Sequence, residues 1–193
     1  MNNNHLHISY QSDNLAFPEI IIEPDRAPKK TLIVVDMQND FIDGSLGTKE
    51  AVAILDNVRA KIRKYRDNGD EIIFTQDTHH HDYMMTNEGK HLPVEHCIEG
   101  TKGWEIRDGL MLKDDLCIKK EQFGFTHWDE YNLEDVELIG LCTDICVVSN
   151  ALIIKALYPE IPVKVDSSCC AGVTTQSHNA ALDTMRSCQI EVF

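Results

Sequence analysis

The sequence has no apolar run long enough to cross a membrane, and it has too few basic residues to balance its acidic ones. It contains 18 lysines and arginines against 32 aspartates and glutamates, which gives a formal net charge of -14. A membrane span needs about 20 apolar residues, and a surface that binds nucleic acid needs an excess of positive charge. We therefore expect neither a membrane nor a nucleic acid as a partner.

Signals for secretion and for disulfide bonding are also missing. The first residues, MNNNHLHISYQ, contain neither the basic start nor the apolar core of a signal peptide. The seven cysteines are odd in number and follow no disulfide framework, so we expect reduced thiols. These features predict a cytoplasmic protein. With 193 residues, 42% of them hydrophobic, the chain is long enough to bury the core of one domain.

Strand and helix patterns alternate from residue 30 onward. Apolar and β-branched runs predict six strands, at 31–35, 71–75, 116–118, 136–140, 162–165 and 189–193. Apolar residues at helical spacing predict helices at 49–68, 145–157 and 176–187. This alternation predicts an α/β fold, a three-layer, doubly wound sandwich around a mostly parallel six-stranded sheet. We predict that residues 1–29 form an N-terminal extension and residues 30–193 the domain.

Cap and stop residues define the ends of these helices. Thr48 is expected to cap the first helix and Gly69 to end it. Either Thr143 or Asp144 is a suitable cap for the second helix, and either Thr174 or Thr175 for the third.

Residues capable of chemistry follow four of the predicted strands. They are Asp36 after the first strand, Asp77 and His79 after the second, Lys119 and Lys120 after the third, and Cys146 after the fourth. In parallel sheets, ligands bind beyond the carboxyl ends of the strands. The sequence therefore predicts that these side chains gather at one edge of the sheet.

Cys146 is the candidate nucleophile of this group. It is predicted in the first turn of a helix, where the helix dipole favours a thiolate and free N–H groups can hold a developing oxyanion. Free cysteines are more often small buried apolar residues. The company of Asp36 and a lysine favours catalysis, because a carboxylate can take the thiol proton and a lysine beside it would lower the pKa of the thiol.

The long segment 76–103 is rich in histidine. Asp77, His79, Glu88 and His96 are suitable ligands for zinc or a similar divalent ion. Segments of this length without predicted structure inside a domain are usually functional. The alternative is an exposed histidine-rich loop that holds no metal.

Five segments together resemble the isochorismatase-like cysteine hydrolases, and within that family the nicotinamidases. The segments are VDMQNDF at 35–41, TQDTH at 75–79, PVEHC at 93–97, KEQF at 120–123 and GLCTDICV at 140–147. The resemblance runs from about residue 31 to residue 193. It implies the α/β fold predicted above.

The resemblance also implies roles for individual residues. Asp36, Lys120 and Cys146 would form a catalytic triad, with Lys120 preferred over Lys119 because it precedes x-x-Phe. An oxyanion hole would come from the backbone N–H groups of Cys142 and Cys146, set by a cis peptide at Leu141-Cys142. Asp77, His79 and His96 would hold a divalent metal, zinc with manganese or iron as alternatives, and Glu88 is left open as a fourth ligand. Phe41 and Phe123 would line the substrate pocket.

The implied activity is the hydrolysis of a small amide, nicotinamide to nicotinate and ammonia, through a thioester on Cys146. The resemblance implies a homo-oligomer and a place in NAD salvage. An alternative within the family is a carbamoyl or ureido substrate, or an isochorismate-like ether, although true isochorismatases typically lack the nucleophilic cysteine. A non-catalytic alternative is a metal-binding or thiol redox module, which would give Asp36 and Lys120 no role.

Overall fold

Six strands form one sheet in the order β3-β2-β1-β4-β5-β6 in the computed structural model, which describes residues 27–193. All five neighbouring pairs are parallel. The strands are β1 (Lys30–Val35), β2 (Glu71–Asp77), β3 (Leu116–Lys120), β4 (Asp135–Leu141), β5 (Val163–Ala171) and β6 (Glu191–Val192). All six predicted strands are confirmed, and the sheet is parallel throughout. The predicted N-terminal extension lies outside the described residues up to residue 26.

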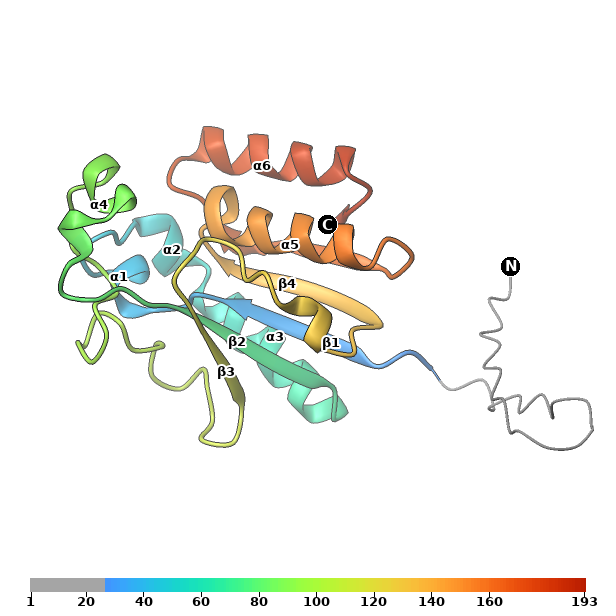
Figure 1. Cartoon of the computed structure of the whole chain (residues 1–193). Helices are drawn as coiled ribbons and strands as arrows, with labels where there is room; N and C mark the ends of the chain where they lie inside the picture. The colour runs from blue at the N-terminus through green and yellow to red at the C-terminus, as the bar shows by residue number, and fades with distance from the viewer. Residues whose placement is uncertain (1–26) are drawn as a thin grey trace, which may run out of the picture.

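Helices cover both faces of the sheet (Figure 1). They are α1 (Asn39–Ile42), α2 (Lys49–Ala53), α3 (Leu55–Asn68), α4 (Asn87–His91), α5 (Val148–Leu157) and α6 (Thr175–Ser187), with short turns of other helix types at η1 (Tyr83–Met85), η2 (Trp128–Glu130) and η3 (Thr143–Val147). Among residues 27–193, none of these helices combines the length and the apolar character that a bilayer span requires. The predicted three-layer sandwich is confirmed.

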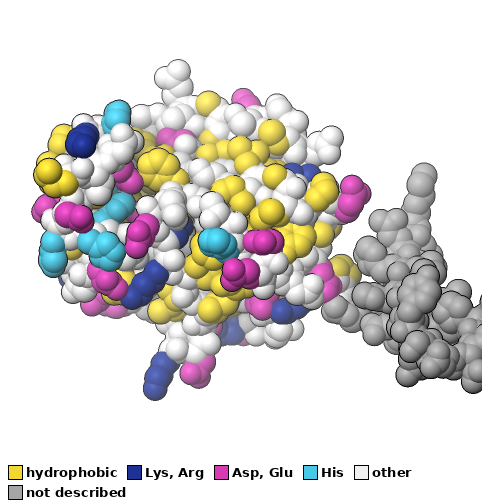
Figure 2. Space-filling model, viewed as in Figure 1, with side chains coloured by type: hydrophobic (Ala, Val, Ile, Leu, Met, Phe, Trp, Pro, Cys, Tyr) yellow, Lys and Arg dark blue, Asp and Glu magenta, His cyan; other side chains and the backbone are white. Residues whose placement is uncertain are grey.

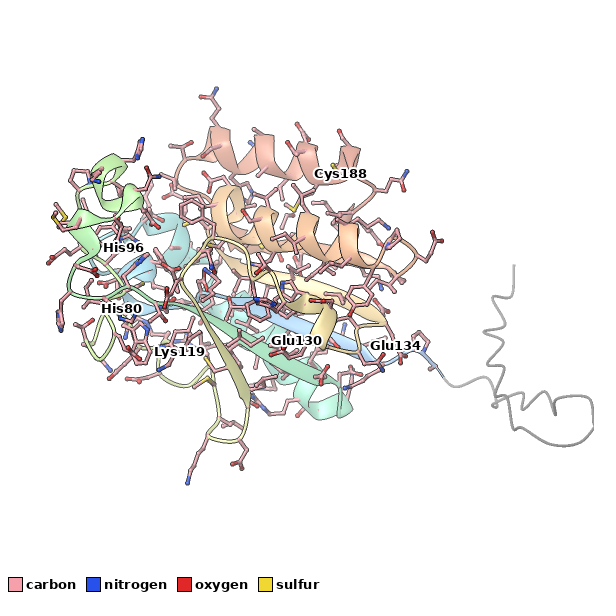
Figure 3. The ribbon with its side chains drawn as sticks, in the orientation of Figure 1. His80, His96, Lys119, Glu130, Glu134 and Cys188 are labelled. Atoms are coloured by element: carbon pink, nitrogen blue, oxygen red, sulfur yellow. The ribbon has the colours of Figure 1, made fainter. Side chains whose placement is uncertain are left out.

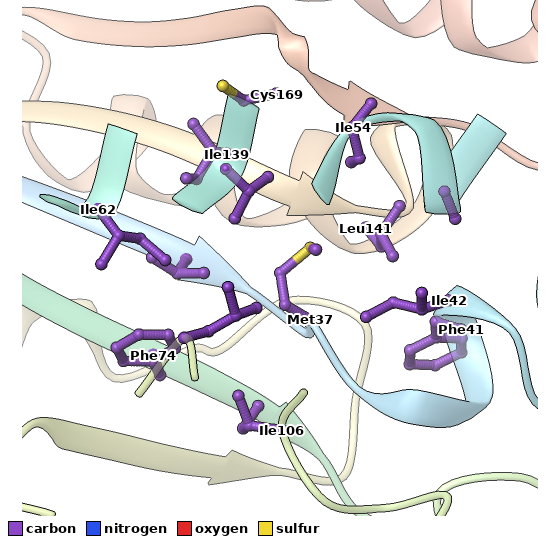
Figure 4. Packing of buried hydrophobic residues seen from close by; sticks show 14 of the residues in the cluster. Met37, Phe41, Ile42, Ile54, Ile62, Phe74, Ile106, Ile139, Leu141 and Cys169 are labelled. Atoms are coloured by element: carbon purple, nitrogen blue, oxygen red, sulfur yellow. The ribbon is translucent and has the colours of Figure 1, made fainter. Parts of the chain in front are cut away.

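The alternating side chains of β1 supply two separate cores. Leu32 and Val34 pack with α3 on one face, where Figure 4 shows Ile62 over the sheet. Ile33 and Val35 pack with α5 and α6 on the other face. Successive residues of a strand point to opposite faces, so a continuous apolar run is the pattern of a strand buried on both sides.

The first predicted helix is two helices in the structure. Thr48 caps α2 by accepting a hydrogen bond from the Ala51 N–H, and Gly69 ends α3 with φ 74°, as predicted. Between them, the Ile54 N–H donates a hydrogen bond to the Val52 carbonyl, two residues earlier. This bond interrupts the regular pattern of helical hydrogen bonds, which join residues four apart. The prediction of one helix over 49–68 is therefore wrong at Ile54.

The predicted caps of the helix after β4 are also wrong. A π-helical turn, η3, comes first with Cys142 as its N-cap, and α5 begins only at Val148. Thr143 is engaged elsewhere, because its hydroxyl lies 2.8 Å from His178 Nδ1. Asp144 accepts a hydrogen bond from the Val173 N–H at 3.1 Å. Tertiary partners therefore use both side chains that the local pattern offered as caps.

Of the two residues predicted as caps of the last helix, the structure selects Thr174. Thr174 is the N-cap of α6, and its side chain and that of Ser177 bond each other's backbone N–H groups in a capping box.

Gly140 brings β4 close to β1 at the edge where the strands end. Its φ is 119°, and a Cβ added there would lie 2.1 Å from the Val35 carbonyl oxygen. A side chain at this position would therefore separate the two strands whose ends lead to Asp36 and Cys146.

Candidate active site

Lys120 lies between the other two residues of the predicted triad. Its Nζ atom is 2.6 Å from Asp36 Oδ2 and 3.5 Å from Cys146 Sγ. The same atom is 3.1 Å from Asp77 Oδ1. The side chains of Lys120 and Asp36 are fully buried, and Cys146 is buried with 4% of its surface exposed. The structure therefore brings together the three residues that three separate strands deliver.

Backbone and side-chain bonds hold Asp36 in place. It directly follows β1, with φ 46°, and its N–H donates to the Thr75 carbonyl at 3.2 Å. The Thr75 hydroxyl donates to Asp36 Oδ1 at 2.6 Å. One carboxylate oxygen is thus held by Thr75, and the other faces Lys120.

Burial sets the proton affinities of this group. Burial raises the pKa of the Cys146 thiol well above its ordinary value, and the Asp36 carboxylate adds to this effect, while Lys120 opposes it. Lys120 therefore lowers the pKa of the thiol as expected, but burial and Asp36 outweigh it, so the net pKa is raised. Burial also raises the pKa of Asp36, against the effect of Lys120. The thiol keeps its proton at neutral pH and needs a base, and Asp36 is a stronger base than an exposed carboxylate.

Lys120 remains charged in this setting. Burial alone would lower the pKa of Lys120, but Asp36, Cys146 and Asp77 outweigh burial and raise it. The site therefore contains a permanent positive charge beside the thiol.

A second group, Asp77, His79 and His96, lies within the same region, with ligand atoms all within 4.8 Å of one another. His79 Nε2 is 3.0 Å from Asp77 Oδ2, and this buried nitrogen has no hydrogen-bond partner among the described residues. His96 Nδ1 lies 2.9 Å from the Val94 carbonyl oxygen, so it carries the proton and leaves Nε2 free for a ligand bond. Two free imidazole nitrogens and a carboxylate form a donor set that fits a divalent metal ion.

Glu88 joins this group from α4. Its Oε1 atom is 3.7 Å from His79 Nε2 and 3.6 Å from His96 Nε2. The α4 helix begins at a Thr86 cap, which accepts from the Gly89 N–H. Glu88 therefore stands where a fourth ligand would stand.

Two residues that contact Asp77, His79 or His96 were not identified as site residues from the sequence. The Gln38 side chain accepts a hydrogen bond from the Asp77 N–H at 2.7 Å and donates one to the Asp77 carbonyl at 2.8 Å. The Tyr83 ring lies 4.7 Å from the His79 ring and 5.0 Å from the His96 ring. Glutamine and tyrosine have many ordinary roles, so only the position of Gln38 inside VDMQNDF offered a signal.

A cavity of about 990 Å³ connects the two groups. Its lining includes Cys142 and Cys146 together with Asp77, His79, Glu88 and His96. Phe41 and Phe123 both line it. Phe41 is buried with its ring 5.5 Å from that of His96, whereas Phe123 is 45% exposed. The peptide bond between Leu141 and Cys142 is cis, as the resemblance implied.

The alternative lysine, Lys119, lies apart from this arrangement. Lys119 is exposed and bonds Glu99 at 2.7 Å, with its Nζ 4.9 Å from the centre of the Trp104 ring. His80, which was not predicted as a site residue, is exposed and lines the cavity, but its ring nitrogens face Glu99 and Glu121 rather than Asp77, His79 and His96, although it lies at the same end of the molecule as His96 (Figure 3).

The chain is similar to known proteins in both sequence and fold. The family model described as Isochorismatase domain matches residues 30–193. A nicotinamidase of Schizosaccharomyces pombe is 26% identical over 83% of this chain and 91% of its own length. An Arabidopsis thaliana protein described as a probable inactive nicotinamidase is 28% identical over 84% of this chain and 90% of its own length. The crystal structure of a Pyrococcus horikoshii pyrazinamidase in complex with zinc matches with a TM-score of 0.75 and 28% identity, over 86% of this chain and 99% of that one.

Proposed function

The chain belongs to the isochorismatase domain family, and we propose that it is a cysteine amidohydrolase of the nicotinamidase type. Its reaction would convert a small amide, with nicotinamide as the first candidate, to a carboxylate and ammonia. The observation that carries the proposal is the position of Lys120, 2.6 Å from Asp36 Oδ2 and 3.5 Å from Cys146 Sγ. Because relatives include a protein described as inactive, the arrangement of these three residues supports activity better than overall similarity does.

Asp36 acts as the proton carrier in the proposed reaction. It takes the proton of the Cys146 thiol as the sulfur attacks the amide carbonyl, and then gives that proton to the departing nitrogen, which leaves as ammonia. The resulting thioester is attacked by water, from which Asp36 takes a proton. The carbon–sulfur bond breaks, the carboxylate product leaves and the thiol regains its proton.

Lys120 and the backbone of the η3 turn stabilise charge in this scheme. The Lys120 ammonium balances the negative charge that passes between Asp36 and the sulfur. The backbone N–H groups of Cys142 and Cys146 are proposed to hold the oxygen that becomes negative when the carbonyl is attacked.

Asp77, His79 and His96, with Glu88, are the residues that would hold a divalent metal. A metal bound there supplies a positive centre that can orient a ring nitrogen of the substrate. Zinc suits the donor set, and manganese and iron are the alternatives. Phe41 and Phe123 are proposed as walls for the substrate. The cytoplasmic location, the homo-oligomer and the place in NAD salvage stay predictions.

Ammonia release from nicotinamide and pyrazinamide tests this proposal. We expect turnover by the wild-type protein and at least a thousandfold loss in Cys146→Ala. Cys188→Ala is the matched control, since Cys188 is exposed at the end of α6 away from the site (Figure 3). Equal rates for wild type and Cys146→Ala would contradict the proposal.

The non-catalytic alternative has less support from the geometry. A thiol redox pair of Cys142 and Cys146 needs thiolates, whereas burial raises the pKa of Cys142 to about 12 and also raises that of Cys146. A metal-binding or thiol redox module would also not require the contacts of Lys120 with Asp36 and Cys146.

A further inference from the structure

The cavity is larger than a one-ring amide requires. Its volume of about 990 Å³ lies at the upper end of the roughly 300–1,000 Å³ that is typical of pockets for drug-sized ligands. A single aromatic ring with a carboxamide group is much smaller than such ligands. If the amide group lies at Cys146, a large part of the cavity is left for a further portion of the substrate.

Apolar side chains form the walls of this remaining space. Leu46, Ala51, Leu92, Phe123 and Val173 line the cavity from separate segments of the chain. Leu92 is 37% exposed and Val173 is 55% exposed, although both are apolar. Exposed apolar groups around a concave site are typical of surfaces that bind an apolar ligand.

Two of these walls are anchored to the reactive groups. The Leu92 carbonyl accepts a 2.9 Å hydrogen bond from the Tyr83 hydroxyl, and the Tyr83 ring packs on His79 and His96. The Val173 N–H donates to Asp144, two residues before Cys146. Leu92 therefore marks the wall on the side of the metal group, and Val173 marks the wall on the side of the nucleophile.

The charge of the lining is acidic. Asp77, Asp82, Glu88 and Glu121 line the cavity, and among its described lining residues there is no lysine or arginine. Figure 2 shows acidic and histidine side chains gathered at the end of the molecule that carries α4. Lys120 is buried and already paired with Asp36 and Asp77. A carboxylate on the outer part of a substrate would therefore face several acidic side chains and, apart from the histidines His79, His80, His91 and His96, no basic side chain that could offset its desolvation.

We propose that the site takes a neutral primary amide whose acyl group is apolar and larger than one aromatic ring. This inference rests on the proposed function, because that function places the amide group at Cys146. It disfavours N-carbamoyl amino acids and isochorismate-like substrates, since both carry carboxylates.

Binding to the Cys146→Ala protein tests the inference without turnover. Three ligands are compared by calorimetry, at the measured metal content of the protein: nicotinamide, quinoline-3-carboxamide, and quinoline-3-carboxamide with a carboxylate on its second ring. The first two share the pyridine nitrogen and the amide and differ by one fused ring. We expect quinoline-3-carboxamide to bind at least tenfold more tightly than nicotinamide, and the carboxylated ligand at least tenfold more weakly than quinoline-3-carboxamide.

A variant that narrows the cavity provides the second measurement. Val173→Trp should reduce the preference for quinoline-3-carboxamide over nicotinamide at least tenfold. Leu112→Trp is the matched control, because Leu112 is 55% exposed and does not line the cavity. This control should keep the wild-type preference.

The outcomes separate this inference from the proposed function. Equal or weaker binding of quinoline-3-carboxamide, or equal binding of its carboxylated form, overturns the inference even if nicotinamide is hydrolysed. Loss of ammonia release from every amide overturns the proposed function, while the binding ratios still decide what the cavity accepts.

Discussion

Asn150 donates a 2.8 Å hydrogen bond from its side-chain amide to the carbonyl oxygen of Cys146. Its side-chain oxygen accepts from the Phe125 N–H and from the Trp128 indole N–H, at 2.9 and 3.0 Å. The residue is fully buried. One side chain therefore ties the turn that carries the candidate nucleophile to the segment that follows β3.

Removal of this amide should cost both stability and rate. Asn150→Ala leaves buried partners without hydrogen bonds, so we expect the free energy of unfolding to fall by about 2 kcal/mol. The first-order rate of ammonia release should fall as well, because the Cys146 turn loses its anchor. Urea denaturation and the rate assay check the two effects. Asn132→Ala is the control, because Asn132 is exposed and its side chain bonds a residue close in sequence, Glu134. An equal effect of the two substitutions would contradict the role of Asn150.

Loss of the Asp36 carboxylate should stop proton transfer while the site stays assembled. Asp36→Asn keeps the size of the side chain but cannot take the thiol proton, so we expect kcat to fall by about a hundredfold or more. Substrate binding should change little, because the Asp36 side chain is buried beneath the site. Steady-state kinetics and a binding measurement on the same variant test this. An unchanged kcat would exclude Asp36 as the base.

Substitution by methionine should have a large effect at Lys120 and almost none at Lys119. Lys120→Met leaves two buried carboxylates, Asp36 and Asp77, without their cation, so we expect a loss of about 3 kcal/mol or more in stability. Adding Asp36→Asn to Lys120→Met should recover part of that loss. Lys119→Met changes an exposed residue and should leave stability and activity near wild type. Similar losses in the two single variants would show that the buried contacts of Lys120 carry no special weight.

Metal content should follow the donor atoms of the second group. His79→Ala and His96→Ala should abolish binding of zinc, manganese or iron, measured by elemental analysis after dialysis. Glu88→Gln should weaken binding by about tenfold, since three donors remain. Gln38→Leu should weaken it by a similar factor, because Gln38 holds both backbone groups of Asp77. Full metal retention in His96→Ala would contradict the assignment of this site.

The pH dependence of stability should depend on Lys61. Its Nζ atom lies 2.8 Å from Asp166 and 2.5 Å from Glu137. Burial would raise the pKa of Asp166, but its bonds with Lys61 and Ser168 outweigh burial and lower that pKa. A carboxyl group with a pKa lowered by folding stabilises the native state above its unfolded pKa of about 4, and this contribution is lost as the pH falls below that value.

Lys61→Met should therefore destabilise the protein at pH 7 and much less at about pH 3. Urea denaturation at both pH values measures the difference. Lys64→Met, at an exposed position of the same helix, should show no such change with pH. A Lys61→Met penalty that stays constant across this range would contradict the stated link between Lys61 and Asp166.

The local sequence determined most of the architecture. Runs of β-branched residues separated by helical patterns specify a parallel sheet, and residues that follow its strands must meet at the edge where all the strands end. The neighbourhood of Asp36, Asp77 and Cys146 follows from this rule. Residue types alone left Lys119 and Lys120 equivalent, and only the resemblance favoured one of them.

Tertiary structure decided the properties that depend on neighbours distant in the chain. Neighbouring residues of β3 point to opposite faces, so the register of the sheet turns Lys120 inward to Asp36 and leaves Lys119 to Glu99 at the surface. The pKa of Cys146 rises because packing removes water from the thiol, which no local helix signal expresses. Thr143 and Asp144 do not cap their helix, because His178 of α6 and the Val173 N–H, in the segment between β5 and α6, bind their side chains.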